Sequence, residues 1–198
     1  GYNHLYLFDT TGRCLRQLTS GRWVVLDLIG FNRKAKSAII LSNEASPIQN
    51  NLYSVSLKTG RRTPIDNGRG LHARYFMRGE ASAMLSESGS LLFDHYTEPD
   101  VPRNVCVTNT ATGRSAEIFS APDPWAGYAV PEYSCGTIKA ADDSTDLYFR
   151  MVKPIGFDPA KKYPTIVYVY GGPGVRNVEA GWHYQSRSWE TYMAQKGY

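Results

Sequence analysis

The chain has 198 residues, 42% hydrophobic and 13% aromatic, which excludes a disordered protein and allows a substantial buried core. Its formal charge of +4 comes from 22 basic and 18 acidic residues spread along the sequence. Because no basic block or nucleic-acid motif accompanies this excess, we expect no nucleic-acid binding. The 14 tyrosines and many short apolar runs favour a mainly β protein, since aromatic and β-branched side chains suit a pleated surface.

The cysteines and histidines form no recognisable site in the sequence. Cys14, Cys106 and Cys135 are odd in number and far apart, so they match neither a disulfide framework nor a CxxC motif. We expect them to be small buried residues, and the sequence leaves open whether Cys14 and Cys106 form a disulfide. The histidines, which lack the spacing of known metal motifs, are His4, His72, His95 and His183. We therefore expect no metal and no cofactor.

No targeting or membrane segment is visible in the sequence. No run of about 18 apolar residues occurs, so we expect no transmembrane helix. The chain opens at Gly1 without a methionine and is interpreted as an excised piece. The absence of a signal peptide therefore carries little meaning for localisation.

The tripeptide Thr-Gly-Arg recurs three times in the first two thirds of the chain, at residues 11–13, 59–61 and 112–114. Each copy follows one short alternating run and precedes another, and glycine supplies the positive φ that a tight hairpin requires. The recurrence of run, turn and run in the same order indicates a repeated hairpin rather than three unrelated turns.

Further pairs of strands are expected between these hairpins. They are residues 23–31 with 36–44, and either 72–79 or 81–86 with 88–97. Four strands in each unit of about 50 residues is typical of a β-propeller blade, which buries one face against the next blade. We therefore predict that residues 1–121 form about two and a half four-stranded blades. Too few blades are present to close a ring, and the uncovered edges should favour self-association.

The pattern changes near Pro122. The proline-rich stretch 121–132 reads as a connection between domains. Residues 133–154 are predicted to form two strands joined by a polar turn at 142–144. The run 165–171, "TIVYVYG", is unbroken and apolar, as in a strand covered on both faces.

The last residues are predicted to form a helix capped near Ser186 or Ser188 and stopped by Gly197. Its apolar side is expected to consist of Trp189, Tyr192 and Met193. Strand, glycine loop and helix together suggest that residues 122–198 contain the junction to an α/β domain and the start of that domain.

The glycine loop "YGGPG" at 170–174 has three possible explanations. A dinucleotide site or a P-loop would need GxGxxG or GxxxxGK[ST], and neither pattern is present. A structural turn is one remaining reading. The other is an oxyanion hole, because α/β-hydrolases place such donors in a glycine-rich loop after an early strand. Tyr170 would add a hydroxyl donor to it.

The run "LYFRMVKPIGFDPAKKYPTIVYVYGGPG", together with "GYNHLYLFD", "LSNEASPIQNNLYSVSL" and "WETYMAQKGY", resembles the prolyl oligopeptidase family of serine peptidases. The likeness covers essentially the whole chain and is greatest to the bacterial dipeptidyl peptidase IV branch. It implies a propeller followed by an α/β-hydrolase domain, and it assigns Tyr170 as an oxyanion-hole donor. It also implies a peptide substrate with a free amino terminus, release of Xaa-Pro or Xaa-Ala dipeptides through an acyl-serine, a homodimer, and a periplasmic or surface location.

The motifs that the chain lacks limit this interpretation. No GxSxG and no Glu-Glu pair occur, so the resemblance places the catalytic serine, aspartate and histidine and the amine-binding glutamates outside these residues. None of the four histidines, including His183, is therefore assigned as a base, and we expect the isolated chain to be inactive. Two alternatives stay open: a related prolyl tripeptidyl or acylaminoacyl peptidase, and a non-enzymatic propeller module that binds a partner.

Overall fold

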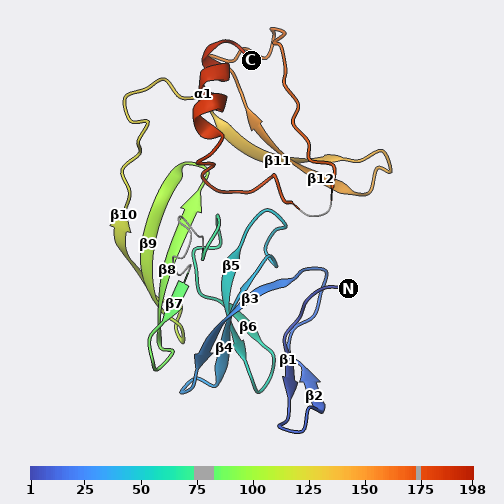
Figure 1. The fold of residues 1–198 in the computed structure, drawn as a ribbon, viewed down its shortest axis with the longest axis vertical. Coiled ribbons are helices and arrows are strands. Elements are labelled where there is room, and N and C mark those ends of the chain that lie inside the picture. Colours follow the sequence, from blue (N-terminus) through green and yellow to red (C-terminus); the bar gives the residue numbers. More distant parts are fainter. Residues whose placement is uncertain (74–82, 173–174) are drawn as a thin grey trace.

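The computed structural model describes residues 1–73, 83–172 and 175–198. The protein is mainly β, with four antiparallel sheets and one short helix in this part of the chain (Figure 1). The first two sheets contain β1 (Tyr6–Phe8), β2 (Cys14–Gln17), β3 (Val25–Asn32), β4 (Ser37–Ser42), β5 (Asn51–Ser56) and β6 (Arg62–Pro64). The other elements are β7 (Ala83–Leu85), β8 (Leu91–Glu98), β9 (Val101–Asn109), β10 (Ser115–Ser120), β11 (Tyr133–Lys139), β12 (Asp146–Val152) and α1 (Arg187–Gln195).

The strands pair in chain order within every sheet. β1 and β2 form a hairpin, β3 to β6 form one four-stranded sheet, and β7 to β10 form a second. The predicted pairs 23–31 with 36–44 and 81–86 with 88–97 correspond to β3–β4 and β7–β8. The other candidate for the second pair, residues 72–79, lies mostly outside the described residues.

The three Thr-Gly-Arg copies all occupy hairpin turns, as predicted. Gly12, Gly60 and Gly113 have φ of 86°, 76° and 72°, the left-handed region that glycine enters without a side-chain penalty. They join β1 to β2, β5 to β6 and β9 to β10. In the first and third turns, Asp9 and Asn109 accept hydrogen bonds from backbone N–H groups of the turn.

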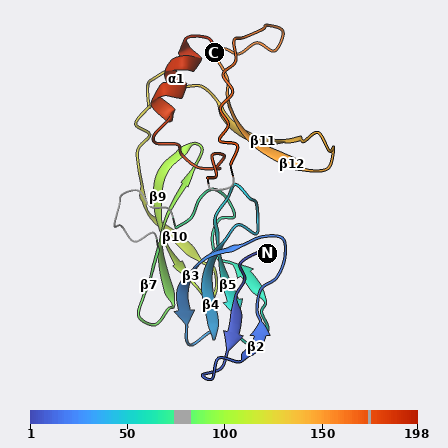
Figure 2. The ribbon, with the colours of Figure 1, turned by 45° about the vertical axis from the view of Figure 1, so that its right-hand side comes forward.

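The core lies on both faces of β4. One face packs with β1–β2 residues in a cluster that includes Leu18, Ala38, Ile40 and Val55. The other face packs toward β7 and β8, in a cluster that includes Ile39, Leu41, Leu52, Ile65, Ala73 and Leu92. The β1–β2 hairpin and the two four-stranded sheets therefore stack side by side, as both ribbon views show (Figure 2).

The β11–β12 hairpin and α1 lie together beyond one end of the four-stranded sheets (Figure 1). Arg150 of β12 makes a paired hydrogen bond with the Glu190 carboxylate, and the Tyr133 hydroxyl lies 2.9 Å from Thr191 Oγ1. The strands follow the predicted pairing, with the turn at Asp142, whose side chain accepts from the N–H groups of Ser144 and Thr145.

The predicted strand at 165–171 is absent from the structure. These residues have no regular secondary structure, and the side chains of the apolar run are exposed, with Tyr168 at 79%. A strand needs a neighbour to accept and donate its backbone hydrogen bonds. No described strand lies beside this segment, so its apolar pattern has nothing to pair with.

The helix forms at the predicted position, and its apolar side is mostly exposed. It begins after Ser186 and ends just before Gly197, which has φ of 89°. Trp189 is 54% exposed and Tyr192 is similarly exposed. The buried side chains are instead Arg187, Thr191 and Ala194. This face contacts the β11–β12 hairpin, whereas no described element covers the tryptophan face.

All three cysteines are free, so Cys14 and Cys106 are not joined by a disulfide. Cys14 is exposed, contrary to the expectation of burial, because β2 is an outer strand exposed along its length. Among the described residues there is no group of three or more His, Cys, Asp or Glu side chains suited to a metal. No helix in the described ranges is both long and apolar enough to span a membrane.

Candidate functional site

The glycine loop places Tyr170 at an exposed turn. Gly171 has φ of 68°, so the chain turns there through a conformation that a residue with a β-carbon enters at a cost. Gly172 lies against the tyrosine ring, because a β-carbon added to it would be 2.9 Å from Tyr170 Cε1. The ring itself is 52% exposed. Glycine is therefore required at these two positions for different reasons: Gly171 permits the turn, and Gly172 leaves room for the tyrosine ring.

The residues after this loop, 176–187, form a segment that we call the docking segment. Its first half is fixed to the connection between β4 and β5. Arg176 donates to the Pro47 carbonyl at 2.9 Å and to Asn50 Oδ1 at 3.0 Å, and it pairs with Glu179 at 2.9 Å. The Ala180 N–H adds a backbone hydrogen bond to the Ile48 carbonyl.

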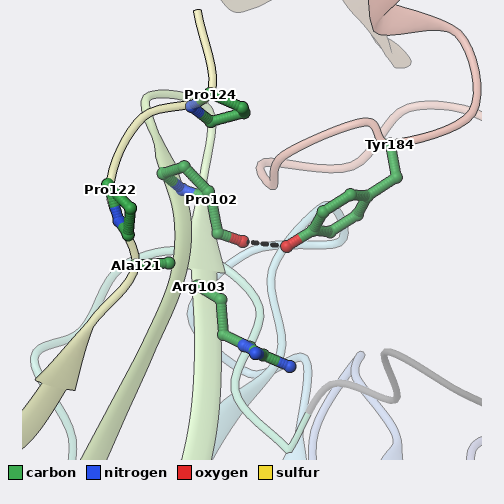
Figure 3. A pocket seen from close by; sticks show the side chains of 6 residues that line it. All are labelled: Pro102, Arg103, Ala121, Pro122, Pro124 and Tyr184. Carbon is green, nitrogen blue, oxygen red and sulfur yellow. Dashed lines mark hydrogen bonds between the residues drawn. The ribbon is translucent and has the colours of Figure 1, made fainter. Parts of the chain in front are cut away.

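The second half of the docking segment is fixed to the other four-stranded sheet. Trp182 N–H donates to Thr97 Oγ1 at 3.0 Å, and the Tyr184 hydroxyl donates to the Pro102 carbonyl of β9 (Figure 3). Just before Trp182, Gly181 packs against Leu71, where a β-carbon would lie 2.5 Å from the leucine Cδ1. The segment therefore crosses both sheets at one end of their stack.

Arg187 closes the docking segment with a buried guanidinium group. Its carbon lies 3.5 Å from the ring centroid of Trp182 and 4.0 Å from that of Tyr133, a double cation–π contact. One terminal nitrogen donates to the Pro99 carbonyl at 2.9 Å, whereas Nε is buried without a hydrogen-bond partner. Burial lowers the pKa of this arginine from its ordinary value. The contact ties α1 to the β8–β9 turn.

A shallow pocket of about 310 Å³ lies between β9, the proline-rich connection and the docking segment (Figure 3). Its lining is formed by Pro102, Arg103, Ala121, Pro122, Pro124 and Tyr184. The lining contains no carboxylate, thiol or imidazole, so it offers shape and one cation rather than acid–base chemistry. Tyr170 is not part of it.

The histidines of the described chain are engaged elsewhere. His72 is buried and lies 2.6 Å from Asp94, but its second ring nitrogen faces Asn67, so it cannot reach a substrate. His183 lies 3.0 Å from the Glu179 carbonyl, and burial lowers its pKa. His4 lies beside Thr19 and Gly21 in the β1–β2 region.

The sequence reasoning singled out Tyr170 but missed the docking segment. Its anchors join residues far apart in the chain, as Arg176 does with Asn50, and no local pattern announces such pairs. The one available signal was the cluster of Trp182, His183 and Tyr184 in a stretch without strand or helix periodicity.

Comparison with known proteins identifies the class to which this architecture belongs. Residues 1–103 match the family model described as the dipeptidyl peptidase IV (DPP IV) N-terminal region, so the chain belongs to this family. The resemblance to dipeptidyl peptidase IV proteins that the sequence predicted is thereby confirmed.

Two solved structures are similar over the whole chain. One is a Bacteroides ovatus protein assigned as a dipeptidyl aminopeptidase IV, with a TM-score of 0.81 and 38% identity over 30% of its length. The other is dipeptidyl peptidase 4 of Porphyromonas gingivalis, with a TM-score of 0.81 and 28% identity over 27% of its length.

A curated relative, dipeptidyl peptidase 4 of the fungus Arthroderma otae, is 30% identical over 92% of this chain and 23% of its own length. The chain spans about a quarter of the length of the curated relatives it matches. Relatives of the same name thus occur in fungi as well as in bacteria.

Proposed function

We propose that this chain is part of a serine exopeptidase that removes Xaa-Pro or Xaa-Ala dipeptides from the amino terminus of peptides. Membership of the DPP IV N-terminal family and the names of the relatives support a dipeptidyl peptidase. The observation that carries the proposal is the state of Tyr170. Its ring is half exposed at a glycine turn, and among the described residues its hydroxyl has no hydrogen-bond partner. The phenol is therefore free to meet a substrate.

In the proposed mechanism Tyr170 donates a hydrogen bond to the carbonyl oxygen of the bond being cleaved. Attack by a serine hydroxyl turns that oxygen into an oxyanion, and a donor held in place stabilises the charge as it develops. Because the hydrogen bond strengthens on the way to the transition state, it should contribute to turnover more than to substrate affinity.

The division into domains is also part of the proposal. Residues 1–121 would be the last part of a β-propeller, a reading supported by the stacking of the β1–β2 hairpin and the two four-stranded sheets. Residues 122–198 would be the junction and the start of an α/β-hydrolase domain. The exposed apolar run 166–170 and the exposed Trp189 are surfaces that further strands and helices of such a domain would cover.

The chain on its own would not hydrolyse peptides. It lacks a GxSxG motif for the nucleophile and a Glu-Glu pair for the substrate ammonium, so these groups would come from the rest of a longer protein. The isolated chain would also self-associate through the uncovered edges of its partial propeller, and the full-length protein would be a homodimer.

The test is the substitution Tyr170→Phe in the full-length protein, assayed with a Gly-Pro anilide. We expect kcat to fall about 10²- to 10³-fold, the range found when one oxyanion-hole donor is removed, with a smaller change in KM. Tyr168→Phe is the matched control, because that side chain is more exposed and lies two residues away. Unchanged turnover in Tyr170→Phe would remove this residue from the mechanism.

The products identify the substrate class. Mass spectrometry of a peptide with proline at its second position should show loss of a dipeptide, and acetylation of the amino terminus should prevent it. A tripeptide product or cleavage of the acetylated peptide would instead indicate one of the related peptidases. No hydrolysis of any of these peptides would favour a binding module.

A further inference from the structure

The loop between β6 and β7 carries an unusual buried histidine. Leu71 pairs with Asn50 on one side and with Thr97 of β8 on the other, so the first part of this loop, residues 65–73, lies in the seam between the two four-stranded sheets. His72 follows it directly and is only 3% exposed. The protonation state of this ring is therefore decided by protein atoms rather than by water.

The first ring nitrogen of His72 faces a carboxylate that can only accept. Nδ1 lies 2.6 Å from Asp94 Oδ2, and the other oxygen of Asp94 accepts the Ala73 N–H at 2.8 Å. An ionised carboxylate has no proton to donate. Nδ1 must therefore carry a proton for this contact to be a hydrogen bond.

The second ring nitrogen also faces an acceptor. Nε2 lies 3.0 Å from Asn67 Oδ1. The orientation of that amide is fixed by two other contacts: its nitrogen donates to Glu98 Oε1 at 3.0 Å, and its oxygen accepts the Arg69 N–H at 3.0 Å. A flipped amide would place its oxygen against the Glu98 carboxylate. Nε2 therefore needs a proton as well.

A neutral imidazole carries only one N–H, so two acceptors require the doubly protonated ring. The surrounding charges agree with this state. Asp66 Oδ2 is buried 3.7 Å from Nε2, and the Tyr96 ring stacks on the imidazole at a centroid distance of 4.9 Å. Loss of the proton would leave Asp94 and Asp66 buried beside a neutral ring, and a buried charge that loses its partner destabilises a fold strongly.

We propose that His72 is a buried imidazolium that locks residues 65–73, after β6, to β8, so that the packing of the two four-stranded sheets depends on pH. The groups that face it are Asp94, Tyr96 and Glu98 from β8, and Asp66 and Arg69 from its own loop. Arg69 pairs with Glu98 and is mostly exposed, so it does not replace the charge of His72.

The direction of the pH dependence follows from the same contacts. Burial by itself lowers the pKa of His72, but the hydrogen bond and charge of Asp94, with the charge of Asp66, outweigh it and raise the pKa above the ordinary histidine value of about 6.5. A raised folded-state pKa gives stability that is fully present below the unfolded value and is lost as the pH rises through the folded value. The lock should therefore open on the alkaline side.

The lock also lies beneath the docking segment. Gly181 packs on Leu71 and Thr97, and Trp182 N–H donates to Thr97 Oγ1. Opening of the loop would remove the surface on which this segment rests.

The first test measures urea unfolding of the full-length protein between about pH 6 and about pH 9, a range that covers the titration of a shifted histidine. The midpoint should fall with rising pH in the wild type and change much less in His72→Gln, which should also have the lower midpoint at pH 6. His4→Gln is the control. The Thr19 hydroxyl beside the His4 ring can either donate or accept a hydrogen bond, so the contact of His4 does not require a doubly protonated ring. A slope unaltered by His72→Gln would overturn the proposal.

A second measurement remains decisive even if His72→Gln fails to fold. Solid-state NMR of protein labelled with ¹⁵N-histidine reports directly whether each ring nitrogen carries a proton, and the His72 signals are those displaced in Asp94→Asn. We expect both nitrogens to be protonated at pH 7 in the wild type. A neutral His72 ring at that pH would overturn the proposal, whatever the stability data show.

Discussion

Gly172 lies beneath the ring of Tyr170, with room for a hydrogen atom but not for a methyl group. A β-carbon at this position would come within 2.9 Å of Tyr170 Cε1 and within 3.4 Å of Cδ1 and Cζ. The orientation of the phenol is therefore set by the absence of a side chain two residues later. A change at Gly172 should therefore move the Tyr170 hydroxyl without unfolding the protein, because the ring is half exposed.

The first prediction is that Gly172→Ala lowers turnover of the full-length protein without an equal loss of stability. The half-exposed ring can rotate away at little cost in packing, but its hydroxyl then leaves the place where it would donate. We expect kcat to fall about 10-fold or more, since small displacements of a positioned group are costly, while the urea midpoint stays close to that of the wild type.

Gly171→Ala is the matched comparison for this prediction. A β-carbon there meets no atom within 4 Å, but φ is 68°, so the substitution costs about 1–2 kcal/mol of conformational strain. If Gly172→Ala kept full turnover while Tyr170→Phe did not, the hydroxyl would matter but its support by Gly172 would not.

The second prediction concerns the buried guanidinium of Arg187. Arg187→Ala removes both ring contacts and the donor to Pro99, and we expect a loss of about 2–4 kcal/mol in the free energy of unfolding. Arg187→Met should recover part of that loss, because it fills the space between Trp182 and Tyr133 and removes a charge whose Nε has no partner.

Urea denaturation of the full-length protein measures these changes. We expect the free energy of unfolding to decrease from the wild type to Arg187→Met and further to Arg187→Ala. Arg13→Ala is the control, because its side chain is 76% exposed and such surface pairs change stability by roughly 0–1 kcal/mol. A loss for Arg187→Ala no larger than for Arg13→Ala would show that this contact does not hold α1 to the β8–β9 turn.

The hairpins could be predicted from the sequence because their causes are local. Gly60 and Gly113 adopt the positive φ that a tight turn demands, and the alternating runs on either side need only each other as partners. A pattern of this kind is complete within about a dozen residues.

The features that the sequence did not predict correctly depend on contacts with residues far away in the chain. The run 165–171 has the composition of a buried strand, but composition does not provide the neighbour to which a strand must bond. The partners of His72 and of the docking segment are likewise set by tertiary packing, since Arg176 and Asn50 are 126 positions apart. Sequence periodicity identifies which residues can form an element, but it does not identify what covers that element.

The last prediction tests the packing of the two four-stranded sheets through Gly89. This residue lies in the turn between β7 and β8 with φ of 70°, and a β-carbon there would overlap the backbone carbonyl oxygen of Phe31 in β3. Neither backbone can move without separating the sheets. Gly89→Ala should therefore cost about 1–2 kcal/mol for the left-handed conformation and a further 1–3 kcal/mol for the overlap.

Gly68→Ala isolates the second contribution. Its φ of 74° gives nearly the same conformational penalty, but a β-carbon there meets nothing within 4 Å. The difference between the two variants in urea denaturation is thus the cost of pushing β3 and the β7–β8 turn apart. Equal losses for both variants would mean that the sheets do not pack as closely in solution as the contact between Gly89 and Phe31 requires.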